Sequence, residues 1–429
     1  MLERIKKALS SCGCDAWEIT ESAERGWEFY FIRRKLDQHR AVDVKTYAVK
    51  IYKYIEDNKF LGSASGEISP TATDEEIAKT LSSLVYQASL VKNPAYTIND
   101  KKIDIPDVTS PVDVESLSRD FIEAMLSVPE TETEYLNSFE IFASGITRRQ
   151  INSNGVEFTC TYPSSTVEVV VNAKKADHEI EVYRFFTSGE CDKEKLVSNV
   201  VSAMRYGSDR LIAQPTPKVR GIDVLLSTDD AADIYRYFIS RTNAAMKVRR
   251  ISDYEIGKPV CEKFEGDRVT VEALSRLKNS SRDIPVDDEG AVIRDRFLIR
   301  DGVTENFWGS RQFSSYLGLE DSSDVRNFFV HGGNDPESVI RTGDYLEVVE
   351  FSDFSVDTMG GDVAGEIRLG YLHRGGKVTV VTGGSISGSL AESAPTIRFS
   401  SETVQYDRIV IPKVTRLGKL RITGVVDEN

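Results

Sequence analysis

Histidines are the first residues to consider for catalysis, because they bind metals and transfer protons at neutral pH. The chain has four of them, namely His39, His178, His331 and His373. A zinc peptidase motif places two histidines on one helix face, with a glutamate beside the first. His178-Glu179 begins such a pattern, but Val182 and Tyr183 stand where the second histidine would be. The residues around His178 also alternate as in a strand, so we expect it to lie on a strand surface.

Acidic residues offer a second candidate site. The run Asp287-Asp288-Glu289-Gly290 could bind a hard cation, but no calcium-loop pattern surrounds it, and a solvated turn is the favoured interpretation. The alternative is an independent hydrolase that uses this run, Asp362 or a serine. Gly383-Gly384-Ser385-Ile386-Ser387-Gly388 comes near the G-x-S-x-G motif without matching it. The sequence contains neither a P-loop nor a G-x-G-x-x-G motif.

The cysteines and the apolar runs indicate in which cellular compartment the protein is expected. Five cysteines, an odd number, are scattered along the chain, which favours reduced thiols over a disulfide framework. Cys12 and Cys14 have no second pair nearby to complete a metal site. No run approaches the roughly 18 apolar residues of a spanning helix, and the N-terminus lacks the apolar stretch of a secretory signal. We expect a cytoplasmic protein that does not associate with membranes.

The composition is typical of a folded protein. Of 429 residues, 40% are hydrophobic and 28% are charged, so enough apolar side chain is present to build a core, which excludes a disordered chain. The formal net charge is −14. A general polyanion binder needs concentrated positive charge, so we expect no direct binding to nucleic acid.

Two similar stretches predict an N-terminal α+β domain over residues 1–213. In the first, a strand-like segment at 47–54 is followed by a helix that begins near Thr73. In the second, a strand-like segment at 181–186 is followed by a helix that begins near Asp192. The pattern predicts a weak structural duplication. Its repeats are expected at about 1–98 and 112–213.

The rest of the chain, residues 218–429, predicts a mostly antiparallel β domain. It begins with a buried strand and a helix over about 229–245, and then becomes rich in turns. Turn residues between apolar runs predict hairpins at 300–302 and 374–376. The predicted fold class is therefore α+β: a duplicated sheet-plus-helix domain followed by an antiparallel β domain.

An ordered series of short motifs over nearly the whole chain resembles the TldD/PmbA family, also called modulators of DNA gyrase. Asp287-Asp288-Glu289-Gly290 resembles the D-x-E-G segment of that family. Further segments fit its spacing, namely Gly62-Ser63-Ala64-Ser65, Leu298-Ile299-Arg300-Asp301-Gly302-Val303, Ser315-Tyr316-Leu317-Gly318-Leu319, Arg326-Asn327, Gly360-Gly361-Asp362, Gly375-Gly376, Ile386-Ser387-Gly388-Ser389-Leu390 and Ile422-Thr423-Gly424.

The family has two branches, and the resemblance implies the PmbA/TldE-like one. TldD-like members are metallopeptidases with HExxxH on a helix and a cysteine near the C-terminus. In this chain Arg236 and Arg241 stand in place of the histidines, Tyr237 in place of the glutamate, and Tyr406 about where the cysteine would be. Guanidiniums keep their proton and repel a divalent cation, so we expect no metal, no other cofactor and no peptidase activity from this chain alone. These side chains could contact a peptide or a partner, or simply cover a helix surface.

The resemblance implies a non-catalytic subunit of a cytoplasmic metallopeptidase complex that cleaves or matures peptides. The expected partners are a TldD-like catalytic subunit, in a heterodimer, or a second copy of this chain, with a peptide as substrate. Two alternatives stay open. One is a regulatory protein that binds DNA gyrase, as the family's label suggests, and the other is the independent hydrolase.

Overall fold

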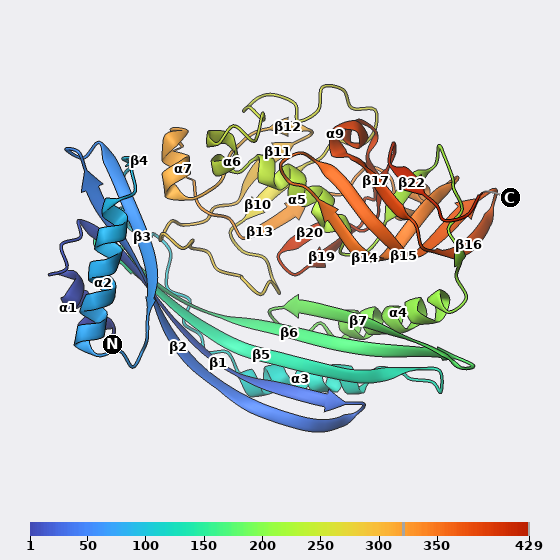
Figure 1. Cartoon of the computed structure of the whole chain (residues 1–429), viewed down its shortest axis with the longest axis horizontal. Coiled ribbons are helices and arrows are strands. Elements are labelled where there is room, and N and C mark those ends of the chain that lie inside the picture. Colours follow the sequence, from blue (N-terminus) through green and yellow to red (C-terminus); the bar gives the residue numbers. More distant parts are fainter. Residues whose placement is uncertain (320–321, 428–429) are drawn as a thin grey trace.

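The structure, a computed structural model, describes residues 1–319 and 322–427, so residues 428 and 429 of the predicted C-terminal domain lie outside the described residues. Its helices and antiparallel sheets confirm the α+β fold class. A long curved sheet, blue to green in Figure 1, is formed by the N-terminal part of the chain, and the C-terminal part lies above it in this view. Among the described residues, no helix is both long and apolar enough to cross a membrane.

Seven strands form the N-terminal sheet. They are β1 (Ala16–Ile32), β2 (Lys35–Ile55), β3 (Phe60–Ile68), β4 (Asn93–Pro94), β5 (Glu134–Asn152), β6 (Glu157–Lys175) and β7 (His178–Ser188). Their order is β4-β3-β2-β1-β5-β6-β7, with every neighbouring pair antiparallel. The two similar stretches of sequence meet where β1 pairs with β5, so they share one continuous sheet. The domain limits and the duplication stay predictions.

Four helices cover one face of this sheet. They are α1 (Leu2–Leu9), α2 (Asp74–Ser89), α3 (Val114–Leu126) and α4 (Lys193–Arg210). Ile151 of β5 packs in the core under α1 and α2, and Ile141 of the same strand packs under α3 and α4. Residues ten positions apart in a strand point to the same face, so all four helices lie on one side. A capping box between Thr73 and Glu76 begins α2, and the side chain of Asp192 caps α4.

The opposite face of the sheet packs against a loop of the C-terminal part. Phe158, Cys160 and Tyr162 of β6 form an apolar cluster with Ile284 and Val286 of that loop. Alternate residues of β6 provide this contact, as expected for one face of a strand. The loop leads directly into the acidic run at 287–289, which therefore lies at the junction between the two parts.

The solvated turn expected for the acidic run is wrong. Asp287 is only 1% exposed. Its carboxylate accepts hydrogen bonds from the backbone N–H groups of Glu289, Ala291 and Asp324, at 2.8 to 2.9 Å. The side chain thus organises its own loop and ties it to residue 324, because a buried carboxylate must find donors.

The next two side chains of the run link the loop to the sheet. Asp288 forms ion pairs with Arg148 of β5, at 2.5 Å, and with Arg326. Glu289 forms an ion pair with Lys50 of β2, at 2.9 Å. The partners lie up to 239 residues away in the sequence, which is why the local pattern could not reveal them.

Two sheets form the C-terminal part. The first has six strands, β10 (Val271–Leu274), β11 (Arg296–Arg300), β12 (Val303–Thr304), β13 (Asn327–Val330), β19 (Thr403–Tyr406) and β20 (Ile409–Pro412). The second has nine, β8 (Gln214–Pro215), β9 (Asp223–Leu226), β14 (Tyr345–Val356), β15 (Asp362–Arg374), β16 (Lys377–Thr382), β17 (Ser385–Ser389), β18 (Arg398–Phe399), β21 (Thr415–Leu417) and β22 (Arg421–Thr423). Both predicted hairpins are confirmed, as β11–β12 and β15–β16.

The helix α5 (Ala231–Arg241) lies between these two sheets, in contact with β14 of one and β20 of the other. Ile234 and Phe238 place it in the largest apolar core. The single helix predicted over 229–245 is in fact two, because the chain turns at Asn243, whose side chain caps α6 (Ala244–Val248). The remaining short helices are α7 (Arg311–Tyr316), α8 (Glu337–Ile340), α9 (Leu390–Ser393) and the 3-10 turn η1 (Ala394–Thr396).

Two buried carboxyl groups, Glu18 and Asp287, should make the free energy of unfolding depend on pH. Burial raises the pKa of Glu18 from its ordinary 4.5 to about 7, although Lys50 opposes the shift. Burial raises the pKa of Asp287 to about 7 as well. Because these folded-state pKa values lie above the unfolded ones, the stability they contribute is present at low pH and is lost as the pH rises through 7. We expect Glu18 alone to lower the free energy of unfolding by about 2 kcal/mol between pH 5.5 and 8.

The Glu18→Gln variant tests this expectation by urea unfolding at both pH values. Its free energy of unfolding should fall less with pH than that of the wild-type protein, with a residual slope from Asp287. Glu67→Gln, which changes an exposed residue of β3, is the matched control and should keep the wild-type slope. An unchanged slope in Glu18→Gln would contradict the assignment.

Candidate functional site

The helix α5 carries three of the four site residues predicted from the sequence. Arg236 is exposed, and its guanidinium pairs with Asp233 one turn earlier. Arg241 is buried, with 8% of its surface exposed. Residues five positions apart lie about 140° apart around an α-helix, so the two guanidiniums do not share a face. The predicted constellation is therefore divided between a solvent-facing and a buried side.

Arg241 is held in place by four neighbours. Its guanidinium donates a hydrogen bond to the carbonyl oxygen of Met359, at 2.9 Å, and another to the Asp253 carboxylate, at 2.5 Å. The guanidinium carbon also lies 5.4 Å from the ring centroid of Tyr237 and 5.2 Å from that of Tyr254. Hydrogen bonding to Arg241 lowers the pKa of Asp253 in turn. This side chain therefore fixes the position of the turn that contains Met359.

Tyr237 packs against the same turn. Gly361 has φ +82°, which favours glycine, and a Cβ atom added to it would lie 3.0 Å from the Tyr237 ring. The carboxylate of Asp357 accepts hydrogen bonds from the backbone N–H groups of Met359 and Gly360, at 3.1 and 2.8 Å. The Gly360-Gly361 motif singled out in the sequence thus closes over the end of α5, and its glycines permit the close approach.

The side chains at the motif positions of α5 do not fit a divalent metal. Two guanidiniums offer protons and positive charge where a metal needs lone pairs. Burial raises the pKa of Tyr237, which keeps its phenol protonated. Across residues 1–319 and 322–427, no group of three or more His, Cys, Asp or Glu side chains is arranged to hold a metal ion.

Tyr406, the fourth predicted residue, lies near the beginning of α5. Burial and the charges of Asp229 and Asp230, which precede the helix, raise its pKa. Lys195 of α4 lies with its Nζ 5.7 Å from the Tyr406 ring centroid. Arg241 ends the same helix, roughly 15 Å further along its axis at 1.5 Å per residue. The structure therefore does not bring Tyr406 together with Arg241.

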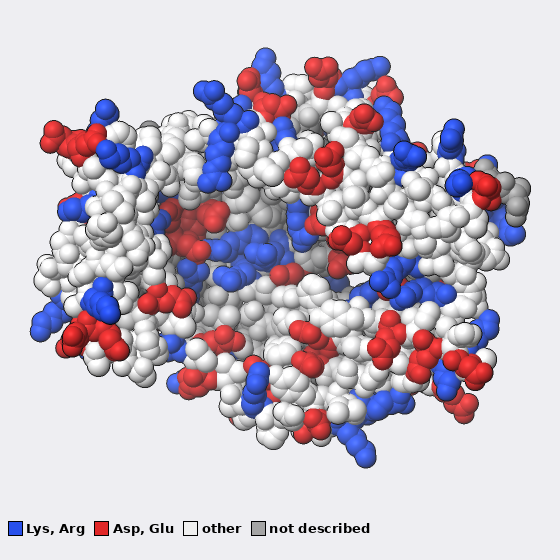
Figure 2. Space-filling view, viewed as in Figure 1, with Lys and Arg blue, Asp and Glu red and all other residues white. Residues whose placement is uncertain are grey.

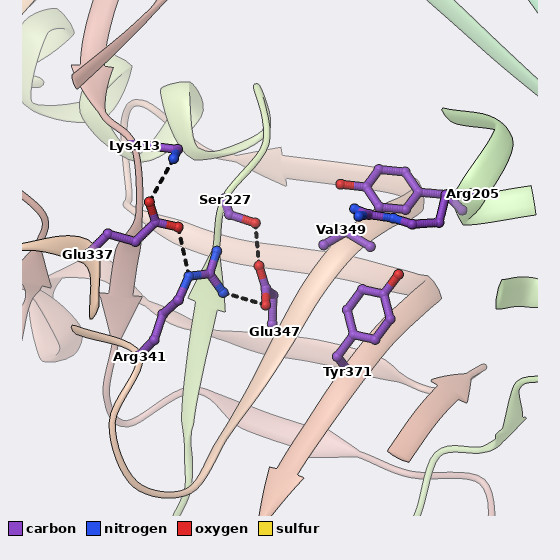
Figure 3. Close-up of a pocket in the computed structure, with 9 residues that line it drawn as sticks. Arg205, Ser227, Glu337, Arg341, Glu347, Val349, Tyr371 and Lys413 are labelled. Atoms are coloured by element: carbon purple, nitrogen blue, oxygen red, sulfur yellow. Dashed lines mark hydrogen bonds and ion pairs between the residues drawn. The ribbon is translucent and has the colours of Figure 1, made fainter. Parts of the chain in front are cut away.

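A polar cavity, which no sequence motif indicates, lies between α4 and the nine-stranded sheet. Its volume is about 330 Å³. Figure 3 shows its walls, which come from α4, the end of β9, α8, β14, β15 and the segment after β20. The lining residues are Arg205, Tyr206, Ser227, Glu337, Arg341, Glu347, Val349, Tyr371 and Lys413. They span more than 200 positions, so no motif could have found them.

Most charges of this cavity are paired within its wall. The buried Glu347 carboxylate accepts hydrogen bonds from Ser227 and Arg341, at 2.5 and 2.6 Å. The Glu337 carboxylate pairs with Arg341 and with Lys413, at 2.9 and 2.7 Å. These dashed contacts run along one side of Figure 3 and make a fixed polar surface.

The remaining predicted residues lie on separate elements. His178 begins β7 with an exposed side chain, which agrees with a strand-surface position. Asp362 is an exposed residue at the beginning of β15, whereas Asp287 is buried. Figure 2 shows a hollow between the curved sheet and the C-terminal part, in which Lys and Arg side chains gather beside Asp and Glu.

Comparison with known protein families matches residues 220–424 to the family described as the PmbA/TldA metallopeptidase C-terminal domain. Comparison with curated proteins gives no match. The matched segment contains α5, every strand of the two C-terminal sheets except β8, and most of the cavity wall.

Solved structures share the fold over nearly the whole chain. TldE from Thermococcus kodakarensis has a TM-score of 0.73 and 14% identity, over 99% of each chain. A candidate modulator of a DNA gyrase from Thermotoga maritima MSB8 has a TM-score of 0.75 and 14% identity, over 98% of this chain and 100% of the other. One from Bacteroides thetaiotaomicron VPI-5482 has a TM-score of 0.76 and 15% identity, over 99% and 98%. At these identities the likeness establishes the fold alone.

The two arginines of α5 should differ in their contribution to stability. Arg241→Ala removes two hydrogen bonds and two ring contacts from a buried site, and should lower the free energy of unfolding by about 2 kcal/mol. Arg236→Ala removes an exposed pair within one helix and should cost less than about 0.5 kcal/mol. Urea unfolding of both variants measures the difference. Equal effects would show that Arg241 does not hold the turn at Met359.

Proposed function

We propose that this chain, whose C-terminal part matches the PmbA/TldA family, is the non-catalytic, PmbA/TldE-like subunit of a metallopeptidase complex. In this role a TldD-like subunit provides the metal and the hydrolytic chemistry, and this chain completes the structure around the peptide. The proposal rests mainly on the residue types at three positions of α5. Arg236, Tyr237 and Arg241 stand there in place of residues that would bind a metal and activate a water molecule.

The contacts of Arg241 support a structural use of the altered helix. A metal site would need its ligands to converge on one point, whereas Arg241 donates to Met359 and Asp253 on two separate segments. The guanidinium therefore cross-links the end of α5 to its surroundings. With no ligand to bind and activate water at this position, hydrolysis at α5 lacks a nucleophile. Cleavage would then depend on the partner's site.

The fold comparison supports the same assignment. One structural neighbour is named TldE, and its likeness extends over 99% of this chain. We extend that name to this chain as part of the proposal, together with proteolysis or maturation of peptides as the role of the complex. The expected assembly is a heterodimer with a TldD-like subunit, with a homodimer as the alternative.

We place the complex in the cytoplasm, as part of the same proposal. All five cysteines are free. Burial raises the pKa of Cys160 to about 11 and that of Cys191 to about 12, so both thiols stay protonated at neutral pH. Buried, unpaired thiols of this kind suit a reducing compartment.

Metal content and activity test the proposal together. The protein, purified alone and without chelator, should contain almost no zinc by plasma mass spectrometry. It should also leave peptides intact in an assay followed by mass spectrometry. A TldD-like subunit from the same organism, prepared in parallel, is the positive control for both measurements.

Mixing the two subunits should form a complex in size-exclusion chromatography and should raise peptide cleavage above that of the TldD-like subunit alone. About one tightly bound zinc per chain, or cleavage by this chain alone, would contradict a non-catalytic role. Full activity of the TldD-like subunit without this chain would contradict the proposed partnership.

A further inference from the structure

We propose that the polar cavity between α4 and β14 binds a carboxylate, that Arg205 recognises it, and that its source is the C-terminal end of a peptide. Naming a peptide rests on the proposed function, whereas the recognition of a carboxylate rests on the cavity itself. The argument depends on which charges of the wall are already paired, on how Arg205 is held, and on the size and polarity of the space.

Arg205 differs from the other cations of the cavity. Arg341 and Lys413 both form ion pairs with carboxylates of the wall. In the part of the chain that the structure describes, no carboxylate lies within 4 Å of the Arg205 guanidinium. Asp209, one turn further along α4, accepts a hydrogen bond from the Tyr371 hydroxyl, at 2.6 Å, and does not pair with Arg205. The wall thus holds three cations and two carboxylates, which leaves one positive charge to attract an anion.

The position of Arg205 suits a planar anion. Its guanidinium carbon lies 5.4 Å from the ring centroid of Tyr206, so the aromatic ring restricts the long side chain. Figure 3 shows Arg205 extending from α4 into the cavity, above Val349 and Tyr371 in this view and on the side opposite Arg341 and Glu337. A guanidinium presents parallel N–H groups that match the two oxygens of a carboxylate. Less conformational entropy is lost on binding when the side chain is already restrained.

The size and chemistry of the cavity favour a peptide end over a lone ion. A volume of about 330 Å³ lies at the lower end of the range for small-molecule pockets, roughly 300–1,000 Å³, and a water molecule takes about 30 Å³. The opposite wall presents the carboxylates of Glu337 and Glu347, which can accept hydrogen bonds from amide N–H groups. A peptide end supplies both the carboxylate and the N–H groups, whereas a simple anion supplies only the first.

Isothermal titration of the full chain alone, with defined peptides, tests the inference. The probes are the tripeptide Ala-Ala-Ala with a free carboxylate, the same peptide with a C-terminal amide, and sodium acetate. The free acid should bind with one site per chain and about tenfold more tightly than the amide, because a charge-assisted pair is lost in the amide. Acetate should bind more weakly than the free acid, since it lacks the N–H groups.

Three variants identify the residue. Arg205→Gln should reduce the affinity for the free acid to that for the amide. Arg205→Lys should give an intermediate affinity, because lysine keeps the positive charge but lacks the parallel N–H groups of the guanidinium. Arg220→Gln removes the same charge from an exposed position outside the cavity and should bind like the wild-type protein. Arg205 is exposed on α4, so circular dichroism should show all three folded.

Several outcomes would overturn the inference. Equal affinity for acid and amide, no binding at millimolar peptide, or an unchanged affinity in Arg205→Gln would each exclude the carboxylate site. Acetate that binds as tightly as the free acid would overturn the peptide as the source. Because the partner is absent from this titration, failure here leaves the proposed subunit role to be decided by the zinc and mixing experiments.

Discussion

A guanidinium buried at the end of α5 must find acceptors, and this requirement organises the surroundings of the helix. The Met359 carbonyl and the Asp253 carboxylate each accept a hydrogen bond from one terminal nitrogen of Arg241, and the rings of Tyr237 and Tyr254 lie close to its guanidinium. The turn at 357–361 is drawn onto the helix as a result, and only a residue without a side chain fits at Gly361. Position 241 thus holds a cation that links the end of α5 to its surroundings.

The same need to pair buried charge joins the two parts of the molecule. Asp287 uses one carboxylate oxygen to order its own loop and the other to hold the backbone of Asp324, and its neighbours Asp288 and Glu289 reach two different strands of the N-terminal sheet. An apolar contact between Tyr162 of the sheet and Ile284 of the loop joins the same two parts of the molecule. These charged contacts and the apolar cluster together hold the curved sheet against the C-terminal part.

The proposed subunit role and the proposed carboxylate site involve different regions of the C-terminal part. The contacts of Arg241 lie at the end of α5, whereas the cavity lies beyond its beginning, next to α4. Tyr206 lines the cavity and also lies close enough to Tyr406 to help raise the pKa of that residue, so the cavity and Tyr406 are neighbours. A peptide end held by Arg205 would therefore lie closer to Tyr406 than to Arg241.

Local pattern was sufficient for several features of the fold. Strand alternation, the caps at Thr73 and Asp192 and the two glycine-containing turns act over a few residues, and each predicted an element that the structure contains. The single helix over 229–245 was wrong because the side chain of Asn243 begins a second helix, a choice that depends on how the chain turns there. The acidic run was misread because its partners are distant in sequence.

The sequence by itself determined that positions 236, 237 and 241 carry two guanidiniums and a phenol, and the protonation chemistry of these groups does not suit a divalent metal. Only the tertiary structure decided that Arg236 faces solvent while Arg241 is enclosed, and that Arg205 faces a cavity without a carboxylate partner. The reason is physical: protonation and ligand chemistry belong to a side chain, whereas burial, pairing and cavity shape depend on residues brought together from distant parts of the chain.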